Sequence, residues 1–287
     1  MSNAEMAILD GASAPDRLTL SLAGGTMIAY TCRAPDKDTD NEDTVGAMAY
    51  GDDAAVMMVA DGAGGLPAGK RASVTAVAEL ERSLKRSLDE NTALRTAILD
   101  GIEAANQAVR DIALGSATTL TVVAVEGATA RAYQIGDSEA LVVGQRGRVR
   151  AQTMAHSPTG FAVEAGFLDQ REALHHAERH LVSNYLGSAD MRIDMGGTID
   201  LQARDTILLA TDGLTDNIHL HEIIELIRKG PLGKSVDALT NLAARRMTTE
   251  SRTMPSKPDD LSLILFRRPP PAKPAPSAAP ACQASAR

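Results

Sequence analysis

Two apolar segments of this chain each end in an Asp-Gly pair. Residues 56–65 read Val-Met-Met-Val-Ala-Asp-Gly-Ala-Gly-Gly, and residues 207–213 read Ile-Leu-Leu-Ala-Thr-Asp-Gly. Apolar runs of this length predict strands that are buried on both faces. A carboxylate at the end of such a strand has to be neutralised, and divalent cations bind clustered carboxylate oxygens. The two segments therefore predict buried strands that deliver Asp61 and Asp212 to a metal site.

The composition of the 287-residue chain is that of a globular protein, with 44% apolar residues and a formal net charge of -8. Negative charge argues against nucleic-acid binding, which requires a basic surface. No apolar stretch reaches the roughly 18 to 20 residues of a membrane-spanning helix, and the first residues lack the pattern of a signal peptide. We therefore expect a cytoplasmic protein that binds neither membranes nor nucleic acids. We expect Cys32 and Cys282 to be free thiols.

The predicted elements follow the order four strands, two helices, four strands and a mixed remainder. The first strands are expected over 17–23, 26–32, 44–50 and 54–60, the helices over 66–86 and 92–114, and the next strands over 118–125, 131–135, 140–143 and 149–152. After an irregular segment, strands are expected over 191–201, 206–211 and 260–267, and helices over 219–228 and 235–250. This order differs from the βαβ alternation of a parallel sheet. It predicts an α+β fold, an αββα sandwich of two mainly antiparallel sheets flanked by helices.

The predicted elements also divide the chain into three parts. The catalytic domain is expected over residues 17–268, after an N-terminal extension over residues 1–16. Residues 269–287 are rich in Pro and Ala. Such a composition buries too little apolar surface to fold, so we expect a disordered tail.

Further carboxylates lie next to other predicted strands. Glu42 and Asp43 precede the third strand, and Asp259 precedes the last. Each could simply be a turn residue, because Asp is common in tight turns. If the strands are neighbours, however, these side chains meet Asp61 and Asp212 at one edge of the sandwich. Two divalent ions about 3.5 to 4 Å apart, bridged by Asp61, would then activate water for attack on phosphorus.

A nucleotide-binding loop is the competing interpretation of the glycine-rich segment. Residues 64–70 read Gly-Gly-Leu-Pro-Ala-Gly-Lys and satisfy the pattern G-x-x-x-x-G-K after a strand. Arg71 follows in place of the Ser or Thr whose hydroxyl binds magnesium, and Pro67 removes a backbone amide from the loop. We therefore favour the interpretation in which Asp61 bridges metal ions.

Seven motifs occur along the chain in the order found in one enzyme family. They are Asn-Glu-Asp (41–43), Val-Ala-Asp-Gly-Ala-Gly-Gly (59–65), Gly-Ser-Ala-Thr-Thr-Leu (115–120), Gln-Ile-Gly-Asp-Ser-Glu-Ala (134–140), Ala-His-Ser (155–157), Leu-Leu-Ala-Thr-Asp-Gly-Leu-Thr-Asp (208–216) and Lys-Pro-Asp-Asp-Leu-Ser (257–262). This set resembles the metal-dependent protein phosphatases of the phosphatase 2C type. The resemblance implies a bacterial serine/threonine phosphatase, in which a hydroxide bound to two Mn²⁺ or Mg²⁺ ions attacks phosphoserine or phosphothreonine directly.

The resemblance also implies roles for single residues. By position, Asp61 bridges two metal ions, and the carbonyl of Gly62 binds one of them. Asp212 and Asp259 complete the coordination of the other ion. Asp137 matches the aspartate with which bacterial members bind a third metal ion. The competing interpretation of Asp137 is a turn residue in a Gly-Asp pair.

The positions that face the substrate match the family pattern in part. Glu42 and Asp43 match the residues that orient metal-bound water. The family usually has an arginine shortly before them that clamps the substrate phosphate, but Asp38 stands in this region. Lys37 or Arg33 could substitute, although a lysine lacks the bidentate fork of arginine.

The residue at position 63 bears on the protonation of the leaving group. Animal members carry a histidine where this chain has Ala63, so water would have to protonate the leaving alkoxide.

The resemblance implies a monomeric enzyme that acts on a phosphoprotein substrate and opposes a serine/threonine kinase. Two alternatives stay open: a pseudophosphatase that only binds phosphoproteins, because the arginine is missing, and a phosphatase of an anti-sigma-factor antagonist, because of the Asp-Asp-x-Ser ending.

Overall fold

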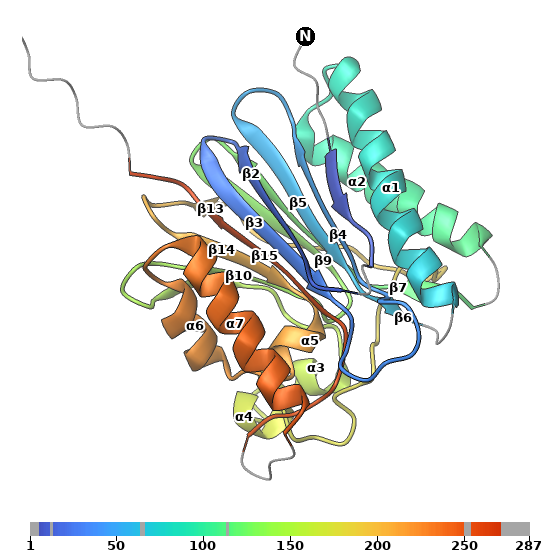
Figure 1. Cartoon of the computed structure of the whole chain (residues 1–287). Helices are drawn as coiled ribbons and strands as arrows, with labels where there is room; N and C mark the ends of the chain where they lie inside the picture. The colour runs from blue at the N-terminus through green and yellow to red at the C-terminus, as the bar shows by residue number, and fades with distance from the viewer. Residues whose placement is uncertain (1–5, 12–13, 64–66, 113–114, 250–253, 271–287) are drawn as a thin grey trace, which may run out of the picture.

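Two antiparallel sheets are stacked face to face, with helices on both outer faces (Figure 1). The computed structural model describes residues 6–11, 14–63, 67–112, 115–249 and 254–270. The first sheet has the order β1-β4-β5-β8-β9-β12, and β13 also pairs with β9. Its strands are β1 (Met6–Leu9), β4 (Thr44–Ala49), β5 (Ala54–Ala60), β8 (Leu120–Glu126), β9 (Thr129–Ile135), β12 (Asp194–Met195) and β13 (Ile199–Asp200).

The second sheet has the order β11-β10-β14-β15-β3-β2. Its strands are β11 (Val149–Gln152), β10 (Glu139–Val143), β14 (Thr206–Ala210), β15 (Leu261–Arg267), β3 (Gly25–Cys32) and β2 (Asp16–Leu22). A two-stranded ribbon of β6 (Gly62–Ala63) and β7 (Ala117–Thr118) follows the end of β5. Each pair of neighbouring strands is antiparallel, so the start of one strand lies beside the end of the next.

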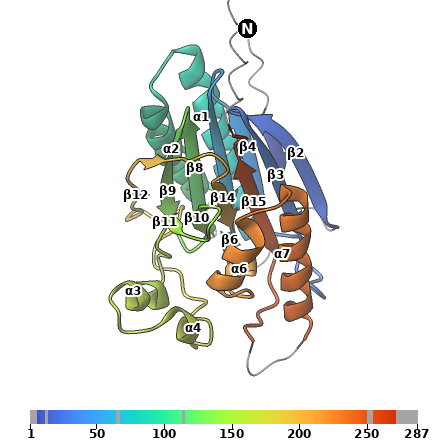
Figure 2. The same ribbon diagram turned by 90° about the vertical axis from the view of Figure 1, so that its left-hand side faces the viewer.

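The long helices cover the outer faces of the two sheets. The helices α1 (Pro67–Asp89) and α2 (Leu94–Asp111) pack on the first sheet, and α6 (Leu220–Ile227) and α7 (Leu232–Met247) pack on the second. Three short helices are α3 (Pro158–Glu164), α4 (Gln170–Ala173) and α5 (Asp212–Thr215). Figure 1 shows all three at the same end of the sandwich as β6, and Figure 2 shows α3 and α4 there from another side.

The hydrophobic core consists of three apolar layers. Along β5, Met57 and Val59 face the second sheet, whereas Val56 and Met58 face α1 and α2. Successive side chains of a strand point to opposite faces, so a strand that is covered on both sides needs an unbroken apolar run. The run before Asp61 is therefore explained by burial on both faces.

The predicted α+β fold, an αββα sandwich of antiparallel sheets, is confirmed. Residues 1–16 were predicted to lie outside the domain, but β1 within them pairs with β4 and forms the edge of the first sheet. The strand predicted over 191–201 is wrong, because Gly196 and Gly197 separate β12 from β13. The predicted tail lies outside the described residues from residue 271 onward. None of the helices in the described ranges is long and apolar enough to cross a membrane.

Candidate metal centre and active site

The predicted carboxylates meet at one end of the sandwich because of the strand register. Thr44 pairs with Ala60, so Asp43 and Asp61 flank the same end of the β4–β5 pair. Ala210 pairs with Leu263 in the same manner, which brings Asp212 toward the start of β15. The two sheets are joined at this end, because the Thr211 hydroxyl donates a hydrogen bond to Asp43 Oδ2 (2.9 Å).

The backbone of Asp61 is held firmly by β7 and the residue that follows it. The Asp61 amide donates to Thr119 Oγ1 (2.9 Å), and the Asp61 carbonyl accepts from the Thr119 amide (2.8 Å) and the Thr118 hydroxyl (2.8 Å). The Thr119 hydroxyl also lies 2.7 Å from the hydroxyl of Ser138, next to Asp137 in the turn between β9 and β10. These bonds fix the backbone of Asp61, whose carboxyl group lies within electrostatic range of Asp43 and Asp212.

Gly62 occupies a position that tolerates no side chain. A Cβ at Gly62 would lie 2.2 Å from the Gly69 carbonyl oxygen, and one at Gly69 would lie 2.4 Å from Glu42 Oε1. The glycines thus let the first turn of α1 approach the Asp61 loop and Glu42. Lys70, the lysine of the competing phosphate-loop interpretation, instead contacts the Gly11 carbonyl (3.2 Å) and Asp40 (3.5 Å). Residues 64–66 of that loop lie outside the described residues.

The carboxylates at this end crowd one another. Burial, and after it the negative charge of Asp43, raises the pKa of Asp61 well above its usual range. Three more carboxylates act on Asp61 in the same direction: Asp212, Asp259 and Asp137. Like charges in a buried cluster are stable only with protons or with cations between them. The cluster therefore has the electrostatic character of a cation site.

Unpaired oxygen atoms give a second test of whether this site fits metal ions. Glu42 Oε1, Asp43 Oδ1 and Asp212 Oδ1 are buried and have no hydrogen-bond partner among the described residues. Buried carboxylate oxygens without partners are rare and are suitable ligands for hard divalent cations. Within the described ranges, no group of three Asp, Glu, His or Cys side chains has the arrangement found around a bound metal ion. The donor set nevertheless fits Mn²⁺ or Mg²⁺ in its chemistry and burial.

A lysine occupies part of the acidic cluster. The Lys257 ammonium contacts Asp212 directly and lies 3.1 Å from both Asp216 and Asp259. Although burial opposes it, the charge of these aspartates raises the pKa of Lys257 above its usual value. Lys257 and Asp216 lie in two of the quoted motifs, but neither was predicted as a site residue. Asp216 follows Asp212 by four residues, and the helical spacing of the two would have placed them on one face if α5 had been predicted.

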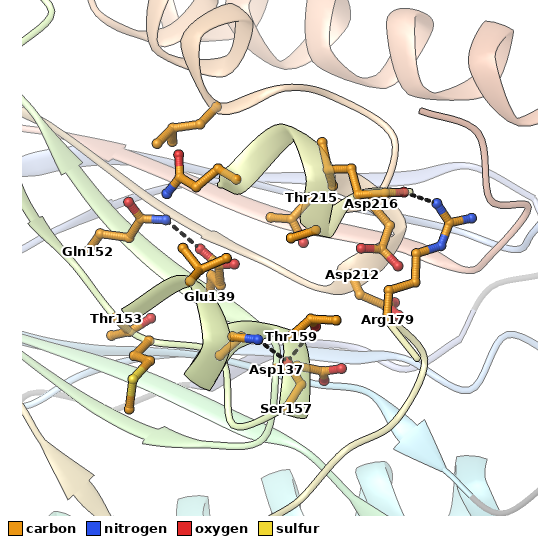
Figure 3. A pocket seen from close by; sticks show the side chains of 18 of the residues that line it. Asp137, Glu139, Gln152, Thr153, Ser157, Thr159, Arg179, Asp212, Thr215 and Asp216 are labelled. Carbon is orange, nitrogen blue, oxygen red and sulfur yellow. Dashed lines mark hydrogen bonds between the residues drawn. The ribbon is translucent and has the colours of Figure 1, made fainter. Parts of the chain in front are cut away.

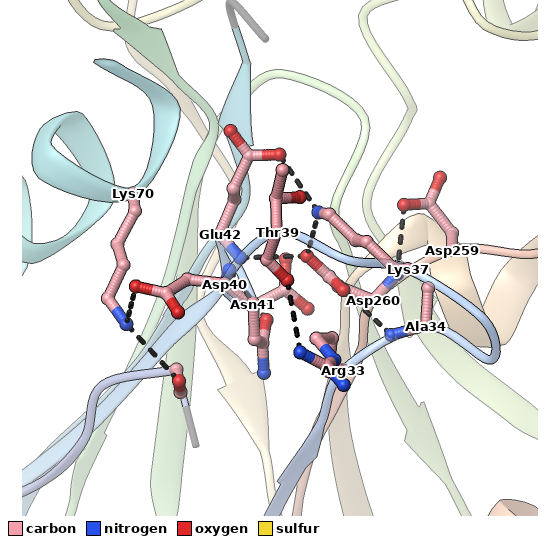
Figure 4. A network of polar contacts seen from close by, with 12 residues as sticks. Arg33, Ala34, Lys37, Thr39, Asp40, Asn41, Glu42, Lys70, Asp259 and Asp260 are labelled. Atoms are coloured by element: carbon pink, nitrogen blue, oxygen red, sulfur yellow. Dashed lines mark hydrogen bonds and ion pairs between the residues drawn. The ribbon is translucent and has the colours of Figure 1, made fainter. Parts of the chain in front are cut away.

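Of the two basic residues predicted to bind phosphate, only Lys37 contacts the carboxylates (Figure 4). Its ammonium lies 2.9 Å from Glu42 Oε2 and 2.6 Å from Asp260 Oδ2. Burial lowers the pKa of Lys37, but hydrogen bonds to Asp260 and Glu42 outweigh it and raise the pKa to about 12. Arg33 Nη1 lies 3.5 Å from the carbonyl oxygen of Thr39.

Asp260 is a further residue of the site that was not predicted. Its carboxylate is buried and accepts hydrogen bonds from the amides of Ala34 (2.8 Å) and Glu42 (2.7 Å) in addition to Lys37. Asp260 therefore fixes the loop that carries Glu42 and Lys37. Its position directly after Asp259 is the sequence feature from which its role at the site could have been predicted.

A cavity of about 230 Å³ opens beside the carboxylates (Figure 3). Asp137, Asp212 and Asp216 line one side of it, and α3, α4 and α6 supply apolar walls. Burial raises the pKa of Glu139 to about 7, although Gln152 donates a hydrogen bond to its carboxylate (2.9 Å). The volume is below the roughly 300 to 1,000 Å³ of drug-sized ligand sites, so the cavity suits a single side chain.

The comparison with protein families identifies similarity along most of the chain. The sequence model described as "Protein phosphatase 2C" matches residues 34–253. Protein phosphatase PhpP of Streptococcus pneumoniae is 30% identical over 215 residues, which cover 72% of this chain and 87% of PhpP.

Solved structures agree with this result. The serine/threonine phosphatase PstP of Mycobacterium tuberculosis is 25% identical, with a TM-score of 0.69, over 85% of this chain and 98% of PstP. The structure of the PstP catalytic domain in complex with two manganese ions has a TM-score of 0.66 at 24% identity, over 84% of this chain and 96% of that one. At that identity, the second likeness supports the fold alone.

Proposed function

Because this chain belongs to the protein phosphatase 2C family, we propose that its carboxylate cluster is the metal centre of a serine/threonine protein phosphatase. The activity is the hydrolysis of phosphoserine and phosphothreonine in proteins. The observation that carries the proposal is the set of buried, unpaired carboxylate oxygens on Glu42, Asp43 and Asp212, beside the crowded carboxyl of Asp61.

The ligands that we assign come from three segments: the residues directly after β5, the start of α5 and the residues before β15. Asp61, the carbonyl of Gly62, Asp212 and Asp259 would hold two Mn²⁺ or Mg²⁺ ions. When bound, such ions provide positive charge at the transferring phosphoryl group and lower the pKa of water to near neutrality. The fixed backbone of Asp61 supports its assignment as the shared ligand, because the hydrogen bonds to Thr118 and Thr119 limit its movement. Asp137 lies within electrostatic reach of Asp212 and Asp216.

Glu42 and Asp43 are assigned to orient the attacking water. Each has one carboxylate oxygen that is already bonded within the protein: Glu42 Oε2 to Lys37, and Asp43 Oδ2 to Thr211. The other oxygen of each remains free in the described structure. Such an arrangement fixes the orientation of the carboxyl group and leaves one acceptor for a water proton.

Lys37 is the residue that we assign to the substrate phosphate, in preference to Arg33. Its side chain is 22% exposed, so its ammonium can meet an anion from solvent while Asp260 holds it in place. Arg33 bonds to the backbone of its own loop, and we propose that it supports the position of Lys37. Ala63 is exposed and carries no ionisable group, so water has to protonate the leaving alkoxide.

The partners and cellular setting follow from the same chemistry. A phosphatase consumes phosphoserine and phosphothreonine, so a serine/threonine kinase has to supply its substrate. We infer that the chain acts in the cytoplasm as a monomer. Light scattering of the purified chain checks the last point, with a mass near 30.1 kDa expected.

A phosphatase assay tests the proposed function. The purified chain with Mn²⁺ should hydrolyse p-nitrophenyl phosphate and a phosphothreonine peptide, and chelation should abolish both activities. Asp61→Asn should reduce kcat by at least about 100-fold, because it removes a shared ligand. Asp100→Asn, on the exposed side of α2, is the matched control and should retain full activity. Binding of the phosphopeptide without turnover would contradict the proposal and identify a pseudophosphatase.

A further inference from the structure

The cavity beside the carboxylates extends away from the assigned metal ligands. One end is lined by Asp137, Asp212 and Asp216, and the other end is lined by Glu139 and Gln152 (Figure 3). A phosphorylated residue has to bring its phosphoryl group to the metal ions, so it would occupy the first end. The rest of the cavity is then available to a neighbouring side chain of the same phosphoprotein.

The walls between the two ends are apolar. They are formed by one residue of α3, one that follows α4 and two of α6: Val163, Leu174, Leu220 and Ile223. An aliphatic chain gains free energy when it is buried against walls of this kind. Gln152 is exposed, so the far end of the cavity opens to solvent. A side chain with an aliphatic stem and a polar head matches both features, because its head stays hydrated while its stem is buried.

Glu139 supplies negative charge at the far end. Its Oε2 accepts a hydrogen bond from Gln152 (2.9 Å), and no hydrogen bond to its Oε1 is formed within the described residues. Burial, and to a smaller extent the negative charge of Asp216, raises the pKa of Glu139, and no basic group of the described chain opposes this. Glu164, which is exposed at the end of α3, adds a second negative charge to the lining. A positive charge beside Glu139 would stabilise its ionised form.

The basic residues near the cavity are bonded at its other end. Among the described residues, Arg179 is the one basic residue of the lining, and Figure 3 shows it beside Asp216. Its guanidinium donates to the carbonyl oxygens of Leu174 and Ser256, the second at 3.1 Å. The Lys257 ammonium contacts the aspartates near the metal ligands. The far end therefore has negative charge without a cation of the described chain to balance it.

We propose that this cavity binds a lysine or arginine side chain that lies next to the phosphorylated residue in the substrate. The aliphatic stem would pack on the apolar walls, and the charged head would donate a hydrogen bond to Glu139. An acidic side chain at the same position would meet like charge and would be rejected. The proposal rests on the proposed function and names the substrate class. Glu139 selects the substrate and does not touch the reacting atoms.

Phosphothreonine peptides that differ at one position test the proposal. One peptide carries lysine, another norleucine, which has nearly the same aliphatic stem without the ammonium, and a third glutamate. The varied position is moved in turn through the residues that flank the phosphothreonine, and kcat/KM is measured with Mn²⁺. At one position we expect the kcat/KM of the lysine peptide to exceed that of the norleucine peptide by about five- to tenfold. The glutamate peptide should be the poorest of the three.

Variants separate the cavity from the general attraction of a basic peptide to an acidic protein. Glu139→Gln keeps the shape of the side chain and removes its charge, so it should hydrolyse the lysine and norleucine peptides equally well. Ala173→Phe, which fills the cavity from α4, should also abolish the preference for lysine. Glu103→Gln, on an exposed position of α2, is the matched control and should retain it. The ratio compares two substrates of one preparation, so it does not depend on the fraction of the variant that is folded.

Two results would overturn the proposal. One is equal hydrolysis of the lysine and norleucine peptides at every position by the unmodified chain. The other is a preference for lysine that persists in Glu139→Gln, because the charge would then act elsewhere on the surface. Both results leave the proposed function intact, since the peptides are still hydrolysed. Failure to hydrolyse both the peptides and p-nitrophenyl phosphate would instead refute the phosphatase activity itself.

Discussion

Thr211 makes one of the hydrogen bonds that join the two sheets at the site, so Thr211→Val should destabilise the protein and disturb Asp43. The hydroxyl donates to Asp43 Oδ2 (2.9 Å) and accepts from the amide of Ser262 (3.1 Å), and all three residues are buried. Valine has nearly the same shape, so the substitution creates almost no cavity. It removes a hydrogen bond to a carboxylate and leaves a buried amide unpaired.

The expected loss follows from these two contacts. Each is worth about 1 to 3 kcal/mol when one partner is removed, so we expect the free energy of unfolding to fall by about 3 kcal/mol. For a domain of this size, this corresponds to a decrease in Tm of about 6 to 12 °C. Urea unfolding and thermal melts, both in chelator, measure it.

Thr240→Val is the matched control. Among the described residues, the Thr240 hydroxyl bonds to two helix carbonyls, those of Val236 (3.0 Å) and Asp237 (3.3 Å). Such bonds contribute little to helix stability, so the free energy of unfolding should change by less than about 0.5 kcal/mol. Equal losses in Thr211→Val and Thr240→Val would show that the bond between the sheets is unimportant, and would refute the reasoning.

Three further predictions concern the loop, the phosphate and the metal. Gly62→Ala should lower stability by about 1 to 3 kcal/mol, because its Cβ meets the Gly69 carbonyl at 2.2 Å; Gly197→Ala, whose Cβ meets nothing within 4 Å, should be neutral in the same melt. Lys37→Met should lower kcat/KM for a phosphopeptide by about tenfold or more, and Lys37→Arg should restore most of it; equal activity of all three would exclude a phosphate contact. The gain in Tm on adding Mn²⁺ should grow as pH rises from 5 to 7, and a flat profile would contradict this.

The pKa values of the carboxyl groups explain why the gain in Tm should grow as pH rises. Burial and the charge of Asp212 raise the pKa of Asp216 and of Asp259 to about 6 in the metal-free protein. In the unfolded chain, an Asp titrates near pH 3.8. Between these values the folded state holds more protons, so the metal-free protein loses stability as pH rises toward 6. Metal binds the deprotonated carboxylates, so its stabilising effect increases over the same range.

The sequence was sufficient to predict that carboxylates next to buried strands lie near one another at one end of the sandwich. The apolar runs that end in Asp-Gly made Asp61 and Asp212 conspicuous, and antiparallel pairing brings Asp43 and Asp259 to the same end. These predictions depend on local periodicity and on the order of strands. Both are properties of the sequence pattern itself.

The residues that were missed depend on contacts between distant segments. Lys257 reaches the cluster because Asn217, 40 residues earlier, binds its backbone on both sides. Asp260 is recognisable only once the loop that carries Lys37 and Glu42 has folded over it. Short β1 was overlooked because an edge strand of four residues shows too little alternation to be distinguished from an extension.

The location of bound Mn²⁺ tests the central claim most directly. Crystals of the chain grown with Mn²⁺ should be measured at the manganese absorption edge, where anomalous scattering identifies the metal by element. We predict two anomalous peaks that share Asp61 as a ligand, one of them also contacting Asp212 and Asp259. No peak within coordination distance of Asp61, in crystals of protein that binds Mn²⁺ in solution, would contradict the account.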